Sequence, residues 1–182
     1  MGSGSIAIDC KGNLKDNFCM RKILLSMIAG PCLALGSGLY AAEPITVAGF
    51  SFRPQAGWVN SGNSKFQIRA DNGQVVIIDI QRRSGPVAKA QLNWGAMFPG
   101  SPAPSSSSGS VNNTKVTYLQ FKGTYVPKEN IAGLRPKNPG YSLYGAIIEG
   151  KAGTIWVKMT GPVATVNQNV GKLKAMVTGA LR

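Results

Sequence analysis

Histidine is absent from the sequence, and all three cysteines, Cys10, Cys19 and Cys32, lie close to the N-terminus. The long C-terminal part of the chain therefore has no imidazole base, no thiol nucleophile and none of the usual ligands of zinc or copper. We expect this part to form no disulfide and to hold no metal ion and no cofactor. These absences exclude most hydrolase designs and leave serine, lysine, tyrosine and carboxylate as the reactive groups.

Acidic residues are also scarce. The chain has 7 Asp and Glu against 20 Lys and Arg, so its formal net charge is +13. From Glu43 onward, 16 basic and 5 acidic residues leave a charge of +11, so most of the excess belongs to that part. A basic surface favours an anionic partner, but the same charge is also typical of a solvated surface that keeps a protein soluble.

Catalytic motifs are missing as well. Neither S-x-x-K nor G-x-S-x-G occurs after residue 43, and Gly145–Lys151, the nearest approach to a phosphate-binding loop, lies on a predicted strand and turn without the helix that this motif requires. Of the carboxylates, only Asp79 and Glu149 are candidates for a facing pair. We expect no catalytic residue. The alternative is a hydrolase-type enzyme that uses serine, lysine or a carboxylate in a cleft covered by a loop.

An export leader is indicated near the N-terminus. Arg21 and Lys22 form a short positive segment, and the mostly apolar residues 23–39 follow it, interrupted by Gly30 and Pro31. This apolar run is shorter than the roughly 20 residues that a membrane-spanning helix needs. Such a pattern is typical of a Sec-type signal peptide.

We predict that residues 20–42 are this signal peptide and that it is cleaved after Ala41 or Ala42. Residues 1–19 show no periodicity and are predicted to be an extended, unstructured start. The protein is then periplasmic or secreted, with no stable transmembrane span after cleavage. An uncleaved inner-membrane anchor is the alternative.

One domain is expected over residues 43–182, because a segment of this length encloses a single core. Apolar alternation between turn residues predicts six strands, and helical spacing predicts two helices. The predicted strands are 45–52, 65–70, 74–81, 116–126, 141–149 and 154–160, and the predicted helices are 86–98 and 163–181, in the order βββαβββα. The Ser/Pro/Gly-rich stretch 99–110 between them is predicted to be a flexible loop.

The predicted fold is of the α+β class. Val75–Ile78 and Tyr144–Ile148 are apolar in strands, which indicates that both faces of the sheet are covered. Residues 163–181 carry a clean apolar stripe at helical spacing: Val166, Val170, Leu173, Val177 and Leu181. In the helix 86–98, Ala88, Leu92 and Met97 form a weaker stripe, and Trp94 and Phe98 are four residues apart. We therefore expect an antiparallel sheet of about six strands with a helix on each face, an α/β/α sandwich.

Three segments and the closing helix resemble a PsbP-like domain. The segments are FSFRPQAGW (Phe50–Trp58), YGAIIEG (Tyr144–Gly150) and WVKMTGP (Trp156–Pro162). The resemblance implies the sandwich fold and a role in binding or stabilising partners, since PsbP-like proteins are mostly extrinsic or envelope proteins. It implies no catalytic centre and transfers no functional residue.

Candidate binding residues are basic. One group is Lys115, Lys122, Lys128, Arg135 and Lys137, and the other is Arg82, Arg83 and Lys89. Either group suits phosphate or carboxylate on an anionic envelope polymer or lipid, and a protein partner is equally compatible. Nucleic acid is not expected for an exported chain. The predicted function is thus that of an exported, non-catalytic binding or accessory protein of the bacterial envelope; a subunit of an envelope assembly and a plain solvated surface are the alternatives.

Overall fold

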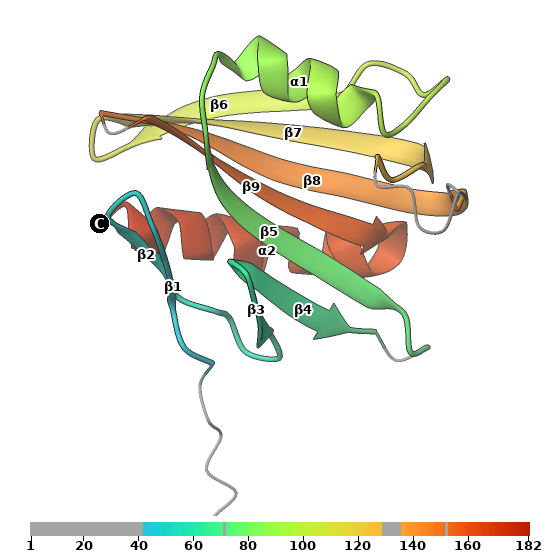
Figure 1. Ribbon diagram of the computed structural model, residues 1–182, viewed down its shortest axis with the longest axis horizontal. Helices are drawn as coiled ribbons and strands as arrows, with labels where there is room; N and C mark the ends of the chain where they lie inside the picture. Colours follow the sequence, from blue (N-terminus) through green and yellow to red (C-terminus); the bar gives the residue numbers. More distant parts are fainter. Residues whose placement is uncertain (1–41, 71, 129–135, 152) are drawn as a thin grey trace, which may run out of the picture. The chain divides into compact units, whose positions relative to one another are not determined.

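The structure is a computed structural model that describes residues 42–70, 72–128, 136–151 and 153–182. The predicted start (1–19) and almost all of the predicted signal peptide (20–42) lie outside these residues. All described elements belong to one compact unit, residues 39–182. Its main element is a seven-stranded antiparallel sheet in the order β3-β4-β5-β9-β8-β7-β6 (Figure 1).

The element bounds are as follows. The seven strands of the large sheet are β3 (Val59–Gly62), β4 (Lys65–Arg69), β5 (Val75–Arg83), β6 (Ser105–Val111), β7 (Thr114–Tyr125), β8 (Asn138–Gly150) and β9 (Gly153–Pro162). A separate two-stranded sheet consists of β1 (Ile45–Val47) and β2 (Phe50–Phe52). The helices are α1 (Val87–Gly95) and α2 (Val163–Ala180), and neither of these described helices is long and apolar enough to cross a membrane.

The predicted fold, about six strands sandwiched between two helices in the order βββαβββα, is wrong. The described residues form nine strands and two helices in the order βββββαββββα, so the protein is mostly sheet. Propensity and apolar alternation found the long strands, but they missed the short strand β3 and the chain reversal between β1 and β2. They also missed β6, whose sequence has no apolar alternation at all.

The predicted first strand, 45–52, is in fact a hairpin. Ala48 and Gly49 have φ angles of 50° and 84°, so the chain turns back at this point and Ile45 pairs with Phe52. Glycine adopts such positive φ angles without a steric penalty, which makes Gly49 a natural turn residue inside an otherwise extended sequence. Ile45 and Phe52 are both buried, and β2 packs against α2.

Residues 105–110, which belong to the predicted flexible loop 99–110, lie in the edge strand β6. Backbone hydrogen bonds hold β6 to β7 from Ser105↔Gln120 to Val111↔Thr114, and the Ser108 and Thr117 hydroxyl oxygens lie 3.1 Å apart. A ladder of backbone hydrogen bonds needs no apolar side chains when the strand is exposed at an edge. The composition of this segment therefore gave a wrong indication of its structure.

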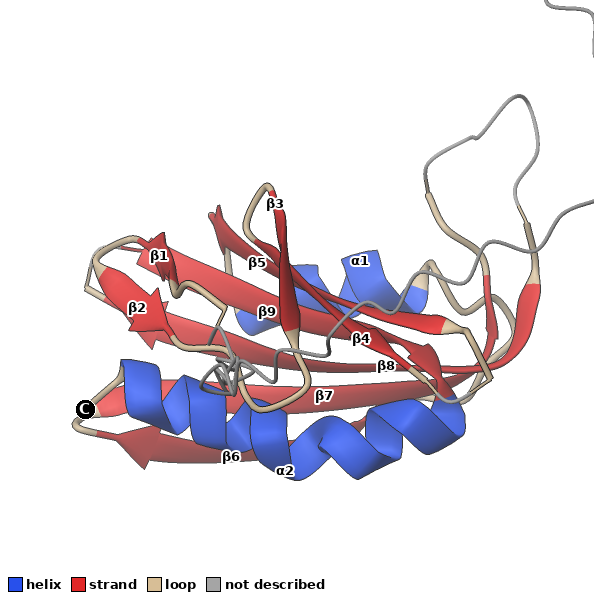
Figure 2. Ribbon diagram, turned by 90° about the horizontal axis from the view of Figure 1, so that it is seen from below, coloured by secondary structure: helices blue, strands red, loops and turns tan. Residues whose placement is uncertain are grey.

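One face of the large sheet, here called the α2 face, carries the larger core. The predicted helix 163–181 is confirmed as α2, which lies in front of the strands in Figure 2 and contacts β8, β9 and β2. Ile78, Val157 and Met159 on the strands are fully buried, as is Leu173 on the helix. The predicted strand 154–160 lies within β9, and its Ile155, Val157 and Met159 alternate along this buried face.

The opposite face, here called the groove face, has only partial cover. Helix α1 contacts β7 and β8, and its Trp94 packs in a second core with Phe121 and Leu143. The predicted stripe of Ala88, Leu92 and Met97 is wrong, because Ala88 and Leu92 are exposed, whereas the predicted pair Trp94 and Phe98 is buried together with Ala90. Helix α1 has nine residues, whereas β8 has thirteen, so polar side chains of β4, β5 and β9 face the space beside it.

Candidate anion-binding groove

Three neighbouring strands place charged side chains in one row on the groove face. Lys65 of β4 pairs with Asp79 of β5, and Asp79 pairs in turn with Lys158 of β9. Residues paired directly across strands share one face of the sheet. Gln81 and Arg83 follow Asp79 at alternate positions of β5 and therefore lie on this face too.

Two adjoining pockets lie between this row and α1. The tryptophan pocket has a volume of about 380 Å³, and its own lining includes Gln81, Arg83, Lys89, Asn93, Trp94 and Trp156. The lysine pocket has a volume of about 270 Å³, and its own lining includes Lys65, Val75, Ile77, Tyr125, Tyr141 and Thr160. Asp79, Met97, Lys128 and Lys158 line both, so the two pockets form one continuous groove.

Positive charge dominates the groove. Among its described lining residues are five cations and a single carboxylate, Asp79; the cations are Lys65, Arg83, Lys89, Lys128 and Lys158. The carboxylate is already engaged, because the Gln81 amide donates to both of its oxygens at 2.9 and 3.0 Å and the Lys158 ammonium lies 3.9 Å away. The excess positive charge of the groove is therefore not neutralised by its own lining.

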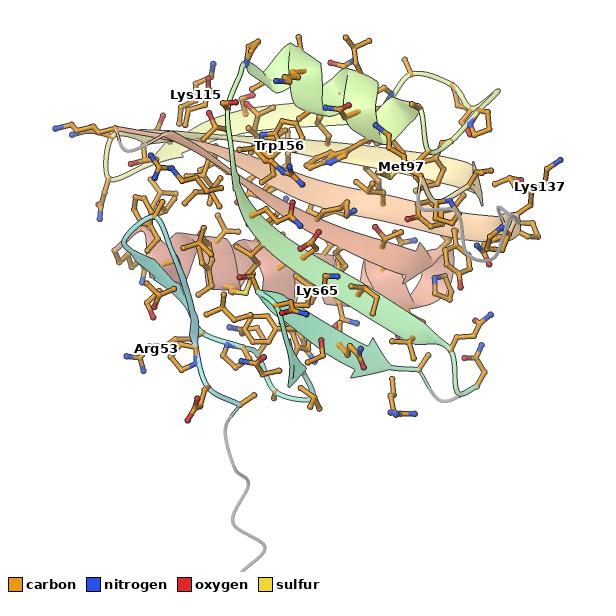
Figure 3. The ribbon with its side chains drawn as sticks, viewed as in Figure 1. Arg53, Lys65, Met97, Lys115, Lys137 and Trp156 are labelled. Carbon is orange, nitrogen blue, oxygen red and sulfur yellow. The ribbon has the colours of Figure 1, made fainter. Side chains whose placement is uncertain are left out.

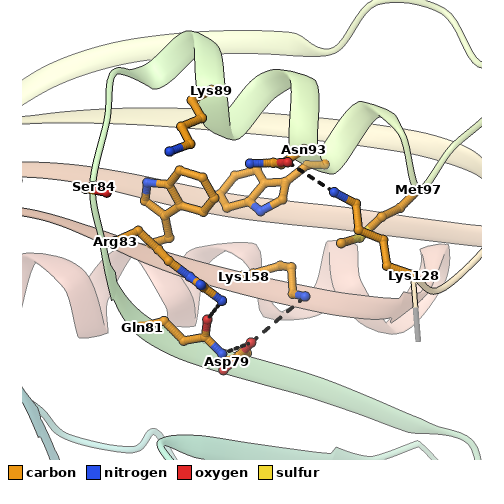
Figure 4. Close-up of a pocket in the computed structure, with 11 residues that line it drawn as sticks. Asp79, Gln81, Arg83, Ser84, Lys89, Asn93, Met97, Lys128 and Lys158 are labelled. Carbon is orange, nitrogen blue, oxygen red and sulfur yellow. Dashed lines mark hydrogen bonds and ion pairs between the residues drawn. The ribbon is translucent and has the colours of Figure 1, made fainter. Parts of the chain in front are cut away.

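Two of the cations hold neutral amides instead of carboxylates. The Arg83 guanidinium donates to the Gln81 amide oxygen, and the Lys128 ammonium donates to the Asn93 amide oxygen at 3.1 Å (Figure 4). A hydrogen bond to a neutral oxygen is weaker than one to an anion. An anionic ligand can thus replace these amides without breaking an ion pair.

Helix α1 is anchored over the groove by Trp94. The Trp94 ring meets the Trp156 ring edge to face, with centroids 5.7 Å apart. The Trp94 ring also lies above Gly145 of β8. A Cβ atom at Gly145 would stand 2.5 Å from two Trp94 ring atoms and 2.9 Å from the Val157 carbonyl oxygen. Glycine at position 145 therefore makes room for the indole that fixes this wall of the groove.

The floor of the groove contains two buried polar groups that have no hydrogen-bond partner among the described residues. They are the indole Nε1 of Trp156 and the hydroxyl oxygen of Thr160. Trp156 is 8% exposed and Thr160 is 8% exposed, and the two residues flank Lys158 on the same face of β9. Buried polar groups in native proteins are nearly always paired, so these two donors are exceptions; both atoms are shielded from the open space of the groove.

The structure brings together only part of the predicted basic set. Lys128, Arg83 and Lys89 line the tryptophan pocket, whereas Arg82 points from the alternate face of β5 and Lys122 from the α2 face of β7. Arg135 lies outside the described residues.

The other two predicted lysines stand at opposite ends of the sheet (Figure 3). Lys115 forms an ion pair with Glu149 at 3.2 Å, and Lys137 is exposed just before β8. The eight predicted residues therefore do not form one surface.

Sequence reasoning missed Lys65 and Lys158, and it considered Asp79 only as a possible partner of Glu149 in a carboxylate pair. The alternation along β5 and β9 could have indicated two of these residues. Ile78 and Val157 point to the buried face, so Asp79 and Lys158, each one residue further along, point to the opposite face. Residues 75–78 were expected to be apolar on both faces, but Val75 and Ile77 are only half-buried and line the lysine pocket.

Neither a metal centre nor a carboxylate pair emerges from the described residues. They contain no group of three His, Cys, Asp or Glu side chains that could hold a metal ion. Asp79 pairs with Lys158 and Glu149 with Lys115, and β9 separates the strands that carry these two carboxylates. Asp79 and Glu149 thus do not face each other as a glycosidase would require.

No protein-family model matches the chain, and no curated protein shows significant similarity to its sequence. The resemblance to PsbP-like domains stays a prediction. Any functional inference must therefore start from the groove itself.

Proposed function

We propose that this chain is a non-catalytic binding protein that holds an anionic ligand in the groove between α1 and β5. One observation carries the proposal. Five cations and one already engaged carboxylate line the groove. All five cations donate hydrogen to an acceptor, which is what an anion supplies.

The electrostatics of the groove support an anion over a neutral ligand. Like charges gathered in a concave site raise the local concentration of counter-ions and speed the approach of an oppositely charged ligand. Arg83 and Lys128 exchange neutral amide oxygens for charged ones when such a ligand enters, and charge-assisted hydrogen bonds are about twice as strong as neutral ones. Binding therefore replaces weak contacts with stronger ones.

The proposal includes an extracytoplasmic location. Its support is the pattern of Arg21, Lys22 and the apolar run that follows them, typical of an export signal. The ligand is then an anionic component of the bacterial envelope or of its surroundings. Fractionation of cells that produce the full-length chain tests this part; recovery of the protein in the cytosol alone would contradict it.

The groove is tested by two double variants that remove the same amount of charge. R83Q/K128Q removes two groove cations, and K122Q/K137Q removes two exposed lysines outside it. The probe is a fluorescein-labelled sulfated dextran fragment, titrated with the full-length chain and followed by fluorescence anisotropy at several salt concentrations.

We expect R83Q/K128Q to weaken binding about tenfold or more, because two hydrogen bonds to charged groups are lost. The control K122Q/K137Q should change the affinity by roughly twofold at most, since exposed charges are screened by solvent. Equal losses in the two variants would show that the whole basic surface binds, and would overturn the groove as the site.

A further inference from the structure

The lysine pocket differs from the rest of the groove in having an apolar floor and walls. Val75 and Ile77 of β5 form the floor, and Met97, Tyr125 and Tyr141 stand around it. All five side chains are half-buried, whereas Val76 and Ile78, the neighbours on the α2 face, are fully buried. Apolar surface is thus left partly in water here, where a ligand that covers it gains free energy from its burial.

The rim of this pocket is cationic. Lys65, Lys128 and Lys158 come from β4, from the segment after β7 and from β9, and all three line the pocket. Lys158 is paired with Asp79 at 3.9 Å, while Lys65 and Lys128 form no ion pair within the described part of the chain. Long lysine side chains around an apolar floor suit a ligand whose charged group lies at the mouth and whose apolar body lies below.

We propose that the lysine pocket takes a small carboxylate with an apolar body, such as an alkyl or aryl carboxylic acid. The carboxylate lies among Lys65, Lys128 and Lys158 at the mouth, and the apolar body covers Val75 and Ile77 below. The volume of about 270 Å³ lies near the lower end for small-molecule sites, which limits the ligand to a short chain or a single ring. This inference rests on the proposed function and narrows it to one ligand class.

Single-stranded nucleic acid fits the same groove less well. Bases bind to such proteins by stacking on exposed aromatic faces. Trp94 and Trp156 are buried and meet each other edge to face, and Tyr125 already stacks on Tyr141 at an interplanar angle of 8°. The described groove therefore presents lysines and aliphatic surface, with its aromatic rings largely packed on one another.

The experiment separates the charged and apolar parts of the ligand. Octanoate has both, 1-octanol has the chain without the charge, and acetate has the charge without the chain. Each is titrated into the ¹⁵N-labelled full-length protein, and the amide resonances of Ile77 and Thr160 report binding at this pocket. We expect octanoate to bind at least roughly tenfold more tightly than either of the other two.

Lys65→Met tests the cationic rim, because methionine keeps an apolar side chain of similar length and removes the charge. It should weaken octanoate binding about tenfold, the loss expected for one hydrogen bond to a charged group. The matched control Lys137→Met, on an exposed lysine outside the groove, should leave octanoate binding unchanged.

The remaining outcomes are distinguishable. Binding of sulfated dextran that depends on Arg83 and Lys128, together with no binding of octanoate, would overturn the carboxylate inference and leave the proposed function standing. Equal binding of octanoate and 1-octanol would overturn the role of the lysines. If neither octanoate nor sulfated dextran binds, both proposals fail.

Discussion

The two faces of the large sheet differ in whether their buried polar groups have hydrogen-bond partners. On the α2 face, the indole nitrogen of Trp58 donates to the Asn169 side-chain oxygen at 3.2 Å, and the Ser142 hydroxyl donates to the Phe121 carbonyl oxygen at 2.8 Å. On the groove face, the indole nitrogen of Trp156 and the hydroxyl of Thr160 have no partner among the described residues. Side chains of the same chemistry are therefore satisfied on one face and unsatisfied on the other.

The difference follows from how each face is covered. Helix α2 has eighteen residues and places Asn169 directly against the indole of Trp58, so this cover supplies hydrogen-bond partners as well as apolar surface. Helix α1 has nine residues and covers only the part of its face near β7 and β8. The α2 face is covered along its length by a helix and contributes to stability. The groove face is covered only in part and offers a binding site.

The largest effect on this comparison is expected at Gly145, where the absence of a side chain lets the Trp94 ring lie against the sheet. Gly145→Ala should lower the free energy of unfolding by about 1–3 kcal/mol, because the added methyl group meets both the indole and a backbone carbonyl. Urea unfolding followed by tryptophan fluorescence measures the change.

The matched control is Gly171→Ala on the exposed side of α2, where nothing stands within 4 Å of the new Cβ atom. It should raise the free energy of unfolding by up to about 1 kcal/mol, since alanine favours helix over glycine. An unchanged stability of Gly145→Ala would mean that Trp94 does not anchor α1 at this point.

Alkaline pH tests the α2 face through Tyr144, whose ring stacks on Tyr118 with centroids 5.9 Å apart. Burial, and secondarily the neighbouring Tyr118, raises the pKa of Tyr144 to about 12 from 10.0. Between these two values the unfolded chain loses the tyrosine proton while the folded chain keeps it. The free energy of unfolding therefore falls as the pH rises from about 10 to about 12.

Tyr144→Phe removes this dependence and keeps the ring. We expect its free energy of unfolding to fall less than that of the unmodified protein over this pH range, with a difference on the order of 2 kcal/mol. The difference between the two denaturation series is the informative quantity, because the two proteins differ only at this hydroxyl. Parallel series would contradict the assignment to Tyr144.

The smallest expected effect is on the free energy of unfolding, when one buried hydroxyl is removed from each face. Ser142→Ala should lower the free energy of unfolding by about 1 kcal/mol, because the Phe121 carbonyl loses its donor. Thr160→Val should leave the stability unchanged or raise it slightly, because no hydrogen bond is lost and a buried polar group is removed. Equal losses in the two variants would mean that Thr160 is paired in the folded protein.

Elements with a strong internal pattern could be predicted from the sequence. The stripe of Val166, Leu173 and Val177 predicted α2, and the alternation of Ile155 and Val157 predicted the strand that became β9. In both elements the apolar period of the sequence matches the geometry of the backbone, so local information is sufficient.

Elements without such a pattern could not be predicted. β6 is a run of serines whose strand geometry comes from pairing with β7, and α1 buries Trp94 on a side of the helix other than the one that Leu92 indicated. Leu92 is 76% exposed. In these cases contacts with distant residues outweigh the local preference.

Only some residues of the candidate site could be predicted from the sequence. Charge counting pointed to an anionic partner and included Arg83, Lys89 and Lys128, which the structure places in the groove. It also included Lys115, which is paired with Glu149, and it missed Lys158, which sits in an apolar strand. Proximity along the chain says little about proximity across a sheet, because neighbouring strands here come from distant segments.

The sequence by itself determined the limits of the chemistry: a chain without histidine, with cysteines only near its N-terminus and with a large positive charge. Those properties belong to composition and hold in any fold. Only the tertiary structure decided which cations gather and which polar groups lack a partner. The register Lys65↔Asp79↔Lys158 and the short reach of α1 bring residues from four elements to one groove, and such long-range pairing is fixed by packing of the whole chain.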